Sequence, residues 1–354
     1  MNILGIETSC DETAAAVVKD GGNILSNAVA SSARMHARFG GIIPEQAARQ
    51  QIKSIISVIE KSLKEAFPKN TTPPAKKIDA IAVTVGPGLI GSLLVGVETA
   101  KTLSVLWEKP IISVNHLVGH IYANWLRTGD VPGNKTPDFP ALCLLVSGGH
   151  TDLVLMKNHG KIKWIGGTRD DAAGEAFDKC ARLLGLTYPG GPSIAKAAAK
   201  YNLQDAKHPI HLPRPMITGD NFEWSFSGLK TAVLREVKKS KKQVRFDKNF
   251  VSSLSFEIQE AICDVLTSKT IRAIQTFKPK SLLLAGGVAA NTRLRQKFQS
   301  EIQKNNLKIE FFVPLANFCT DNAAYIASCA YFNRNFTNWE RVSANPGLTI
   351  SGQD

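Results

Sequence analysis

The chain has 354 residues, a length that predicts two lobes rather than one compact domain. Apolar residues make up 44% of it, enough for buried cores, and no apolar run reaches the roughly 18 residues that span a bilayer. The net charge of +13 favours polyanionic partners, nucleic acid above all, although a generally basic proteome would also explain it. Composition therefore argues against a membrane-spanning protein.

The N-terminus and the cysteines indicate a cytoplasmic protein. The first residues enter a strand-like run at once, so we expect neither a signal peptide nor a transit peptide. The six cysteines form no Cys-x-x-Cys pair, and several lie in apolar runs, which predicts reduced and mostly structural thiols. They are Cys10, Cys143, Cys180, Cys263, Cys319 and Cys329.

The first third of the chain predicts three strands followed by alternating helices and strands. The order is β-β-β-α-β-α-β-α, with the last helix starting near Asn115. The expected strands are 3–8, 13–19, 24–30, 78–85 and 111–114, and the expected helices before the last are 45–67 and 91–107.

The same order recurs beyond a Gly- and Pro-rich segment, 127–138, which is the best candidate linker. The second series has strands at 141–146, 151–156, 162–165, 281–284 and 309–313, and helices at 172–184, 250–277, 289–304 and 321–332. Residues 187–245 contain several prolines and predict a loop-rich insertion. Two such series predict two facing lobes around a cleft, as in sugar kinases and actin-like ATPases.

A pair of histidines four residues apart starts the last helix of the first series. His116 and His120 would lie one turn apart on one face and offer two nitrogen ligands to a metal ion. Zinc proteases have a glutamate after the first histidine, where this chain has Leu117. Asp321 opens the last predicted helix, either as an N-cap or as a third ligand. Two core or surface histidines would give the same spacing.

Residues 86–91 read Gly-x-Gly-x-x-Gly between a strand and a helix, as in dinucleotide-binding proteins. Pro87 lacks the N–H that a pyrophosphate needs, and the next strand ends in Asn115 and His116 instead of an acid. We therefore interpret these glycines as allowing the helix to pack closely on its strand, or as lining the cleft.

Polar turns begin each series and could hold anions. Backbone N–H groups in the turns at 9–13 and 147–151 can form an anion nest. Asp11 and Glu12 lie in the first turn, facing either a ligand or solvent. The glycines at 286–287 allow a nucleotide to approach the backbone. Asp178 shares a helix face with Asp171 and Glu175, which would suit ribose hydroxyls or form an ordinary N-terminal acid cluster.

Taken together, these segments closely resemble the TsaD family, the universal tRNA threonylcarbamoyladenosine transferases. The matching motifs occur in order over nearly the whole chain, at residues 5–13, 36–45, 115–120, 145–151, 170–179, 188–192, 226–230, 286–291 and 319–322.

The resemblance implies an α/β, two-lobe actin-like (ASKHA, duplicated RNase H-like) fold. We expect one lobe of residues 1–129 with a C-terminal helix at about 322–354, and a second lobe of residues 130–321. The implied activity is transfer of the threonylcarbamoyl group from threonylcarbamoyl-AMP to N6 of adenosine 37 in tRNAs that read codons starting with A.

By resemblance, His116, His120 and Asp321 would hold one divalent metal, Fe²⁺ or else Zn²⁺, and Glu12 with Asp11 would serve catalysis. The adenylate would contact Leu145, Val146, Ser147, Gly148, Gly149, Asp178, Gly191 and Asn291. Implied partners are tRNA, TsaB-like and TsaE-like proteins and a TsaC-type enzyme that supplies the adenylate, with a homodimer as the alternative.

Two departures from the family pattern leave the implied ligands untouched. Many bacterial members have Ala-Ser-Arg-Ala-His where this chain has Ala-Ala-Arg-Gln-Gln at 47–51, and the tail at 335–354 is distinctive. Three other functions stay open: a metalloprotease, a sugar or acetate kinase of the same fold, and a non-catalytic tRNA-binding scaffold.

Overall fold

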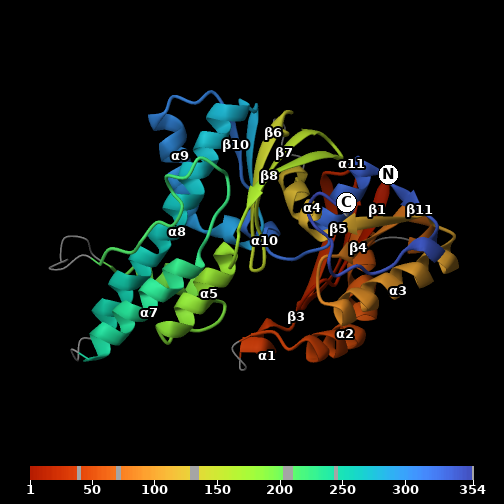
Figure 1. Ribbon diagram of the computed structural model, residues 1–354. Helices are drawn as coiled ribbons and strands as arrows, with labels where there is room; N and C mark the ends of the chain where they lie inside the picture. The colour runs from red at the N-terminus through yellow and green to blue at the C-terminus, as the bar shows by residue number, and fades with distance from the viewer. Residues whose placement is uncertain (38–40, 69–72, 128–134, 202–209, 243–245, 353–354) are drawn as a thin grey trace. The chain divides into compact units, whose positions relative to one another are not determined.

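The structure is a computed structural model of the α/β class (Figure 1). It describes residues 1–354 except 38–40, 69–72, 128–134, 202–209, 243–245 and 353–354. Part of the 36–45 motif, most of the predicted linker and two stretches of the predicted insertion therefore lie outside the described residues.

The chain divides into two compact units. Unit 1 comprises Met1–Pro137, Met156–Ile162 and Pro314–Asp354, and unit 2 comprises Asp138–Leu155 and Lys163–Val313. These bounds differ from the expected lobes at three places, because Lys135–Pro137, the β-hairpin residues Met156–Ile162 and the segment from Pro314 to Asp321 belong to unit 1.

The sheet of unit 1 has the order β11-β5-β4-β1-β2-β3. Strand β1 pairs antiparallel with β2 and parallel with β4. The hairpin between β1 and β2 contains Glu7 and Glu12 at its two ends. The strands are β1 (Asn2–Glu7), β2 (Glu12–Lys19), β3 (Asn23–Ser31), β4 (Ala80–Gly86), β5 (Ile111–Asn115) and β11 (Phe336–Thr337).

Helices cover both faces of this sheet. On β1, Leu4 and Ile6 pack into a core with residues of α2 and α3. Gly5 faces α11 instead, since a β-carbon on it would lie 2.3 Å from the carbonyl oxygen of Ala323 and 3.0 Å from the nitrogen of Ala327. Because neighbouring strand residues point to opposite faces, α11 covers the other face. The helices are α1 (Ala33–Ala37), α2 (Pro44–Ala66), α3 (Ile90–Trp107), α4 (His116–Tyr122), α10 (Ala316–Cys319) and α11 (Ala324–Asn333).

Among the described residues, α3 is the one helix long and apolar enough to cross a membrane by length and composition. It packs against β4 and α2, and Glu98 and Lys101 form an ion pair of 3.1 Å on it. Its buried residues include Leu93, Val97 and Ala100. These contacts are those of a helix that covers a sheet.

The sheet of unit 2 repeats the order of the first. Its order is β10-β9-β6-β7-β8, which matches β5-β4-β1-β2-β3 of unit 1 strand for strand. The predicted duplication is therefore confirmed at the level of topology. The strands are β6 (Ala141–Val146), β7 (Thr151–Asn158), β8 (Lys161–Gly167), β9 (Ser281–Ala285) and β10 (Glu310–Phe312).

The prediction of a loop-rich insertion was wrong for two segments, which form α6 and α7. Prolines drew the prediction towards loop, but Pro189 and Pro192 lie before and inside the first turn of α6, where a missing N–H costs little. The helices of unit 2 are α5 (Ala173–Leu183), α6 (Gly190–Ala198), α7 (Ser227–Lys242), α8 (Lys248–Phe277) and α9 (Thr292–Lys304).

Gly86 and Gly88 serve close packing, but not of the following helix. A β-carbon on Gly86 would lie 1.8 Å from the carbonyl oxygen of Asn345, and one on Gly88 would lie 2.4 Å from that of Ser9. The glycines therefore admit the C-terminal tail and the β1–β2 turn. The tail is fastened there by the N–H of Asn345, which donates to the carbonyl of Val85 at 2.6 Å.

The close approach at Gly286 predicts a selective loss of stability. Gly286 has φ +85°, and a β-carbon there would lie 2.4 Å from the carbonyl oxygen of Val146, whereas Gly287 has open space. Gly286→Ala should lower the stability of unit 2 by about 1–3 kcal/mol, because it combines strain with a clash. Gly287→Ala is the matched control. Denaturant unfolding followed by circular dichroism measures both, and equal midpoints would contradict this account.

Candidate metal centre and nucleotide-binding residues

The histidine pair lies on α4, which begins where it was predicted. Asn115 ends β5 and caps the helix, with its side-chain oxygen accepting from the N–H groups of Leu117 at 2.9 Å and Val118 at 3.3 Å. One turn of helix separates His116 and His120, so both rings leave the same face. Their ring centroids are 4.6 Å apart.

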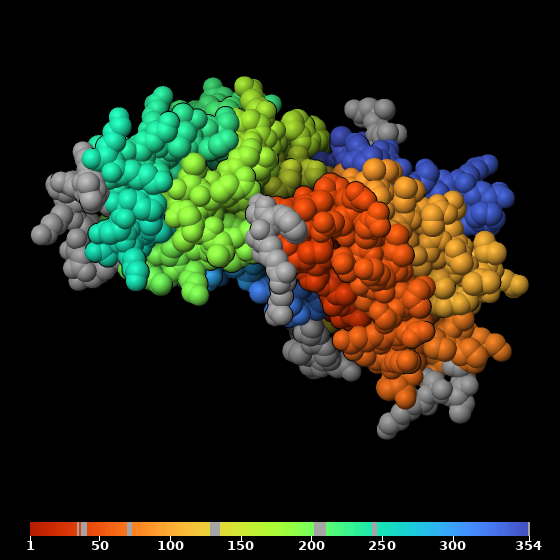
Figure 2. All heavy atoms as spheres, turned by 90° about the horizontal axis from the view of Figure 1, so that it is seen from below, coloured from red at the N-terminus to blue at the C-terminus, as the bar shows by residue number. Residues whose placement is uncertain are grey.

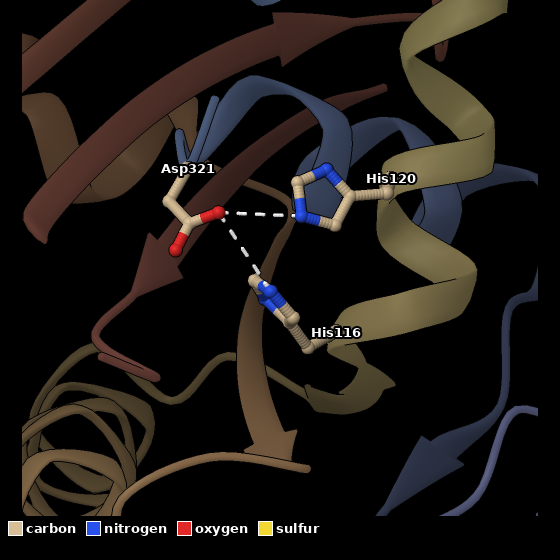
Figure 3. A group of neighbouring side chains, drawn as sticks. All are labelled: His116, His120 and Asp321. Atoms are coloured by element: carbon tan, nitrogen blue, oxygen red, sulfur yellow. Dashed lines mark ion pairs between the residues drawn. The ribbon is translucent and has the colours of Figure 1, made fainter. Parts of the chain in front are cut away.

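Asp321 faces both histidines, as Figure 3 shows. Its Oδ1 lies 3.2 Å from Nε2 of His120 and 3.7 Å from Nε2 of His116. The prediction that Asp321 opens the last helix was wrong, since α11 begins at Ala324, whose N–H donates to the side-chain oxygen of Asn322 at 3.1 Å. The carboxylate is therefore free of capping and points at the imidazoles.

A buried carboxylate, Glu7, holds the far side of His116. The Nδ1 of His116 and Oε2 of Glu7 are 3.0 Å apart, and the Glu7 side chain is fully buried at the end of β1. The hydroxyl of Thr84 donates to the same carboxylate at 2.6 Å, and the N–H of Ser9 donates at 2.5 Å. This contact orients the His116 ring so that Nε2 faces Asp321, where it can bind a cation once it is deprotonated.

The charges of this cluster depend on one another. Burial disfavours the imidazolium form of His116, but the carboxylates of Glu7 and Asp321 outweigh it and raise the pKa of His116 to about 9. Burial likewise opposes ionisation of Asp321, yet the two histidines hold the pKa of that carboxyl well below its usual range. Burial lowers the pKa of His120. The fully buried carboxylate of Glu7 and the partly buried one of Asp321 thus require positive charge beside them.

The donor set fits a divalent cation. The side chains of His116, His120 and Asp321 each offer one ligand atom, and these atoms lie within 4.8 Å of one another. Ligands bound tetrahedrally at about 2.1 Å lie about 3.4 Å apart, close to the two measured Asp321 distances. The carboxylate of Glu7 behind His116 is the usual outer partner of a metal-bound imidazole.

Asp11 and Glu12 lie at the β1–β2 turn of unit 1. Burial, the neighbouring Asp11 and the charge of Asp321 raise the pKa of Glu12 to about 10, so its carboxyl is protonated at neutral pH. The hydroxyl of Ser31 bonds Oε1 of Glu12 at 3.0 Å. Asp11 lines a hollow of about 440 Å³ with Ser31, Ser32 and other polar residues.

The predicted anion turn of unit 2 is open to solvent at its glycines. Nothing lies within 4 Å of the position that a β-carbon would take on Gly148 or Gly149. The turn is fixed at its ends by two hydrogen bonds. The N–H of Ser147 donates to the carbonyl of His150 at 2.8 Å, and the N–H of His150 donates to the hydroxyl oxygen of Ser147 at 3.1 Å. The carbonyl of Ser147 also accepts from the N–H of Gly174 at the start of α5. This rigid turn has room for a ligand above it.

The other residues expected at the adenylate differ in how they are placed. Leu145 and Val146 are fully buried in β6, so they position the turn with their backbone. Gly191 is open, as Gly148 is. Asp178 already accepts the N–H of Gly190 at 2.6 Å, and burial raises its pKa.

Asn291 also has a structural partner at each end of its side chain. It caps α9 through the N–H of Leu294 at 3.0 Å and donates to Gln259 at 3.1 Å.

Two residues of the metal centre were not predicted. Glu7 holds His116, and the hydroxyl of Tyr325 lies 3.5 Å from Oδ1 of Asp321. A carboxylate at the end of an otherwise apolar strand was the available signal for Glu7. No comparable signal marks Tyr325, which lies in a helix that is buried almost all round.

Comparison with known proteins identifies the family. The family model for TsaD, tRNA N6-adenosine threonylcarbamoyltransferase, matches residues 23–328. Proteins of that name from Dehalococcoides mccartyi strain BAV1 and Bacillus cereus strain ATCC 14579 are 51% and 48% identical to the chain. The first match covers 94% of this chain and 93% of the relative, and the second covers 98% and 96%.

Solved structures agree on the fold alone. Full-length HypF in its phosphate- and nucleotide-bound form has a TM-score of 0.54 at 11% identity, covering 96% of this chain and 56% of HypF. Component A of the Acidaminococcus fermentans (R)-2-hydroxyglutaryl-CoA dehydratase has a TM-score of 0.50 at 14% identity, covering 94% and 98%. These neighbours have the actin-like ASKHA fold. With the family model matched over most of its length, the chain belongs to the TsaD family.

Proposed function

We propose that the chain transfers the threonylcarbamoyl group from threonylcarbamoyl-AMP to N6 of adenosine 37 in tRNAs that read codons starting with A. Membership of the TsaD family, whose curated relatives are tRNA N6-adenosine threonylcarbamoyltransferases, is the observation that carries this proposal. The paired histidines facing Asp321 support it, because this chemistry needs an electrophile held and polarised.

The proposed reaction needs no nucleophile from the protein. The substrate is a mixed carbamic–phosphoric anhydride, which is already activated by its AMP leaving group. The cation proposed at the centre, Fe²⁺ or else Zn²⁺, would supply Lewis-acid polarisation of a carbonyl. His116, His120 and Asp321 would hold it, while Glu7 keeps His116 in the tautomer that frees Nε2.

The adenylate would be held by unit 2. The open turn at Gly148 and Gly149 offers backbone N–H groups to the phosphate, whose charge grows as the acyl bond breaks. Gly191 lies at the start of α6, where helix N–H groups also favour an anion. Asp178 and Asn291, both engaged with backbone groups, would contact the nucleoside from fixed positions.

Glu12 would act as a hydrogen-bond donor. Its carboxyl is protonated at neutral pH, so it suits a neutral acid at the acyl group better than a base for the adenine amine. Asp11 beside it lines the polar hollow, where it would orient a substrate group.

The partners and the compartment remain part of the proposal. A tRNA would be bound mainly through its phosphates by a chain with a net charge of +13. We propose that TsaB-like and TsaE-like proteins assist, that a TsaC-type enzyme supplies the adenylate, and that the cytoplasm is the compartment. A self-sufficient homodimer is the alternative assembly, and no membrane partner is needed.

The activity predicts a modified nucleoside in a defined mixture. The chain, tRNA, threonine, bicarbonate and ATP with an adenylate-forming enzyme should yield threonylcarbamoyladenosine, measured by mass spectrometry of digested tRNA. The mixture is tested with and without candidate partners. Absence of the nucleoside under every combination would contradict the proposed function.

The metal centre predicts a specific loss of bound metal. Asp321→Asn removes a charged ligand, so metal content after reconstitution with Fe²⁺ or Zn²⁺ should fall from about one per chain to a small fraction. Asp20→Asn, an exposed acid of the same unit, is the control. Plasma mass spectrometry measures both, and equal metal content would exclude Asp321 as a ligand.

The protonated state of Glu12 predicts unequal effects of two substitutions. Glu12→Gln keeps a neutral donor and should retain most of kcat at pH 7, whereas Glu12→Ala should lose on the order of 10²-fold. Single-turnover transfer to tRNA at saturating adenylate gives both rates. If Gln and Ala variants were equally slow, Glu12 would act as a carboxylate and this assignment would fail.

A further inference from the structure

Helix α7 of unit 2 carries a band of positive charge. Of its 16 residues, six are basic and one, Glu236, is acidic, which gives six minus one, or +5. All six basic side chains are exposed. We call them the α7 basic face: Lys230, Arg235, Lys238, Lys239, Lys241 and Lys242.

This charge is not neutralised by neighbours. Within the described part of the chain, none of the six forms an ion pair with an acidic side chain. The basic residues near α8 behave differently, since Arg293 pairs with Glu260 at 2.6 Å and Lys297 pairs with the same carboxylate at 2.9 Å. The α7 basic face therefore projects its charge into solvent.

The opposite side of α7 is committed to packing. Leu229, Val233 and Val237 recur every four residues and are buried. Helix α7 packs against α5 and α8 (Figure 1). An amphipathic helix that binds a membrane inserts such an apolar side, and here it is already covered. Figure 2 shows the surface of this part of unit 2, where residues around 230–260 are drawn in teal. The surface of α7 that is accessible to a partner is therefore its charged side.

An aromatic ring lies at the C-terminal end of this surface. Phe246 is 36% exposed, and the Nζ of Lys241 is 5.3 Å from its ring centroid. The ring centroids of Phe246 and Phe250 are 5.5 Å apart. Proteins that bind unpaired nucleic acid combine a cationic track with rings on which bases stack. The helix is about 24 Å long, so the track spans several phosphates.

We propose that the α7 basic face with Phe246 is a docking surface for an RNA backbone. The inference rests on the proposed function in naming that RNA as the substrate tRNA. Phosphates contact the lysines and Arg235, and Phe246 receives an unpaired base. These contacts fix the position of the tRNA without reading its sequence.

The test compares two double substitutions of equal charge in the full-length chain. Lys238→Glu with Lys242→Glu removes one turn of the face, and Lys304→Glu with Lys308→Glu changes exposed lysines elsewhere in unit 2. The first variant should bind tRNA roughly ten-fold more weakly, with a slope of log affinity against log salt smaller by about 2. The control should stay within about two-fold of wild type.

Phe246→Ala separates stacking from charge. It should weaken tRNA binding several-fold and leave the salt slope unchanged, because stacking releases no counterions. Unchanged affinity would overturn the role of the ring. Circular dichroism melting establishes that each variant is folded, as expected for exposed positions.

Other outcomes discriminate the alternatives. Equal loss of binding in both double variants would overturn docking on α7 in favour of general charge. Phosphatidylserine vesicles bound by wild type and lost by the α7 variant, with tRNA binding intact, would overturn it in favour of a membrane. Salt-dependent tRNA binding through α7 without any threonylcarbamoyladenosine formed would instead leave the docking surface and refute the proposed function.

Discussion

The hydrogen bond between Glu7 and His116 is the interaction on which the centre depends. It joins the end of β1 to the start of α4, where Glu7 is fully buried and His116 is only 9% exposed. A buried carboxylate is costly unless it is paired, so Glu7, Thr84 and His116 are mutually necessary. The pair also fixes which nitrogen of His116 faces Asp321. The bond therefore ties the position of the first strand to the orientation of a metal ligand on α4.

The sequence predicted what depends on local pattern. Apolar runs marked ten of the described strands, β1 to β10, at nearly the observed places, and their repetition predicted the duplicated topology that both sheets have. The spacing of His116 and His120 predicted two ligands on one helix face, because one turn of α-helix has a fixed length. For Asp321 the sequence left two roles open, an N-cap or a third ligand, and the family resemblance favoured the ligand, since no local pattern links residues so far apart.

What could not be predicted depends on tertiary contact. Gly86 and Gly88 were interpreted as allowing the next helix to pack closely on its strand or as lining the cleft, yet the backbone atoms they admit come from Asn345 and Ser9. Helix α7 was not predicted, because its sequence is rich in lysine and follows a proline-rich stretch. Its few apolar residues are buried through tertiary packing against α5 and α8, which the sequence does not show. The bond from the N–H of Gly190 to Asp178 likewise joins residues that no local pattern links.

The C-terminal tail anchors the segments that carry the histidine pair. Strand β11 pairs with β5, and Asn115, which caps the ligand helix, donates its amide to the carbonyl of Thr349 at 2.7 Å. Asn115 and Thr349 are 234 residues apart in the sequence. The start of the ligand helix is therefore anchored by a distant segment that supplies no ligand, and damage to the tail would loosen His116 and His120 without altering either of them.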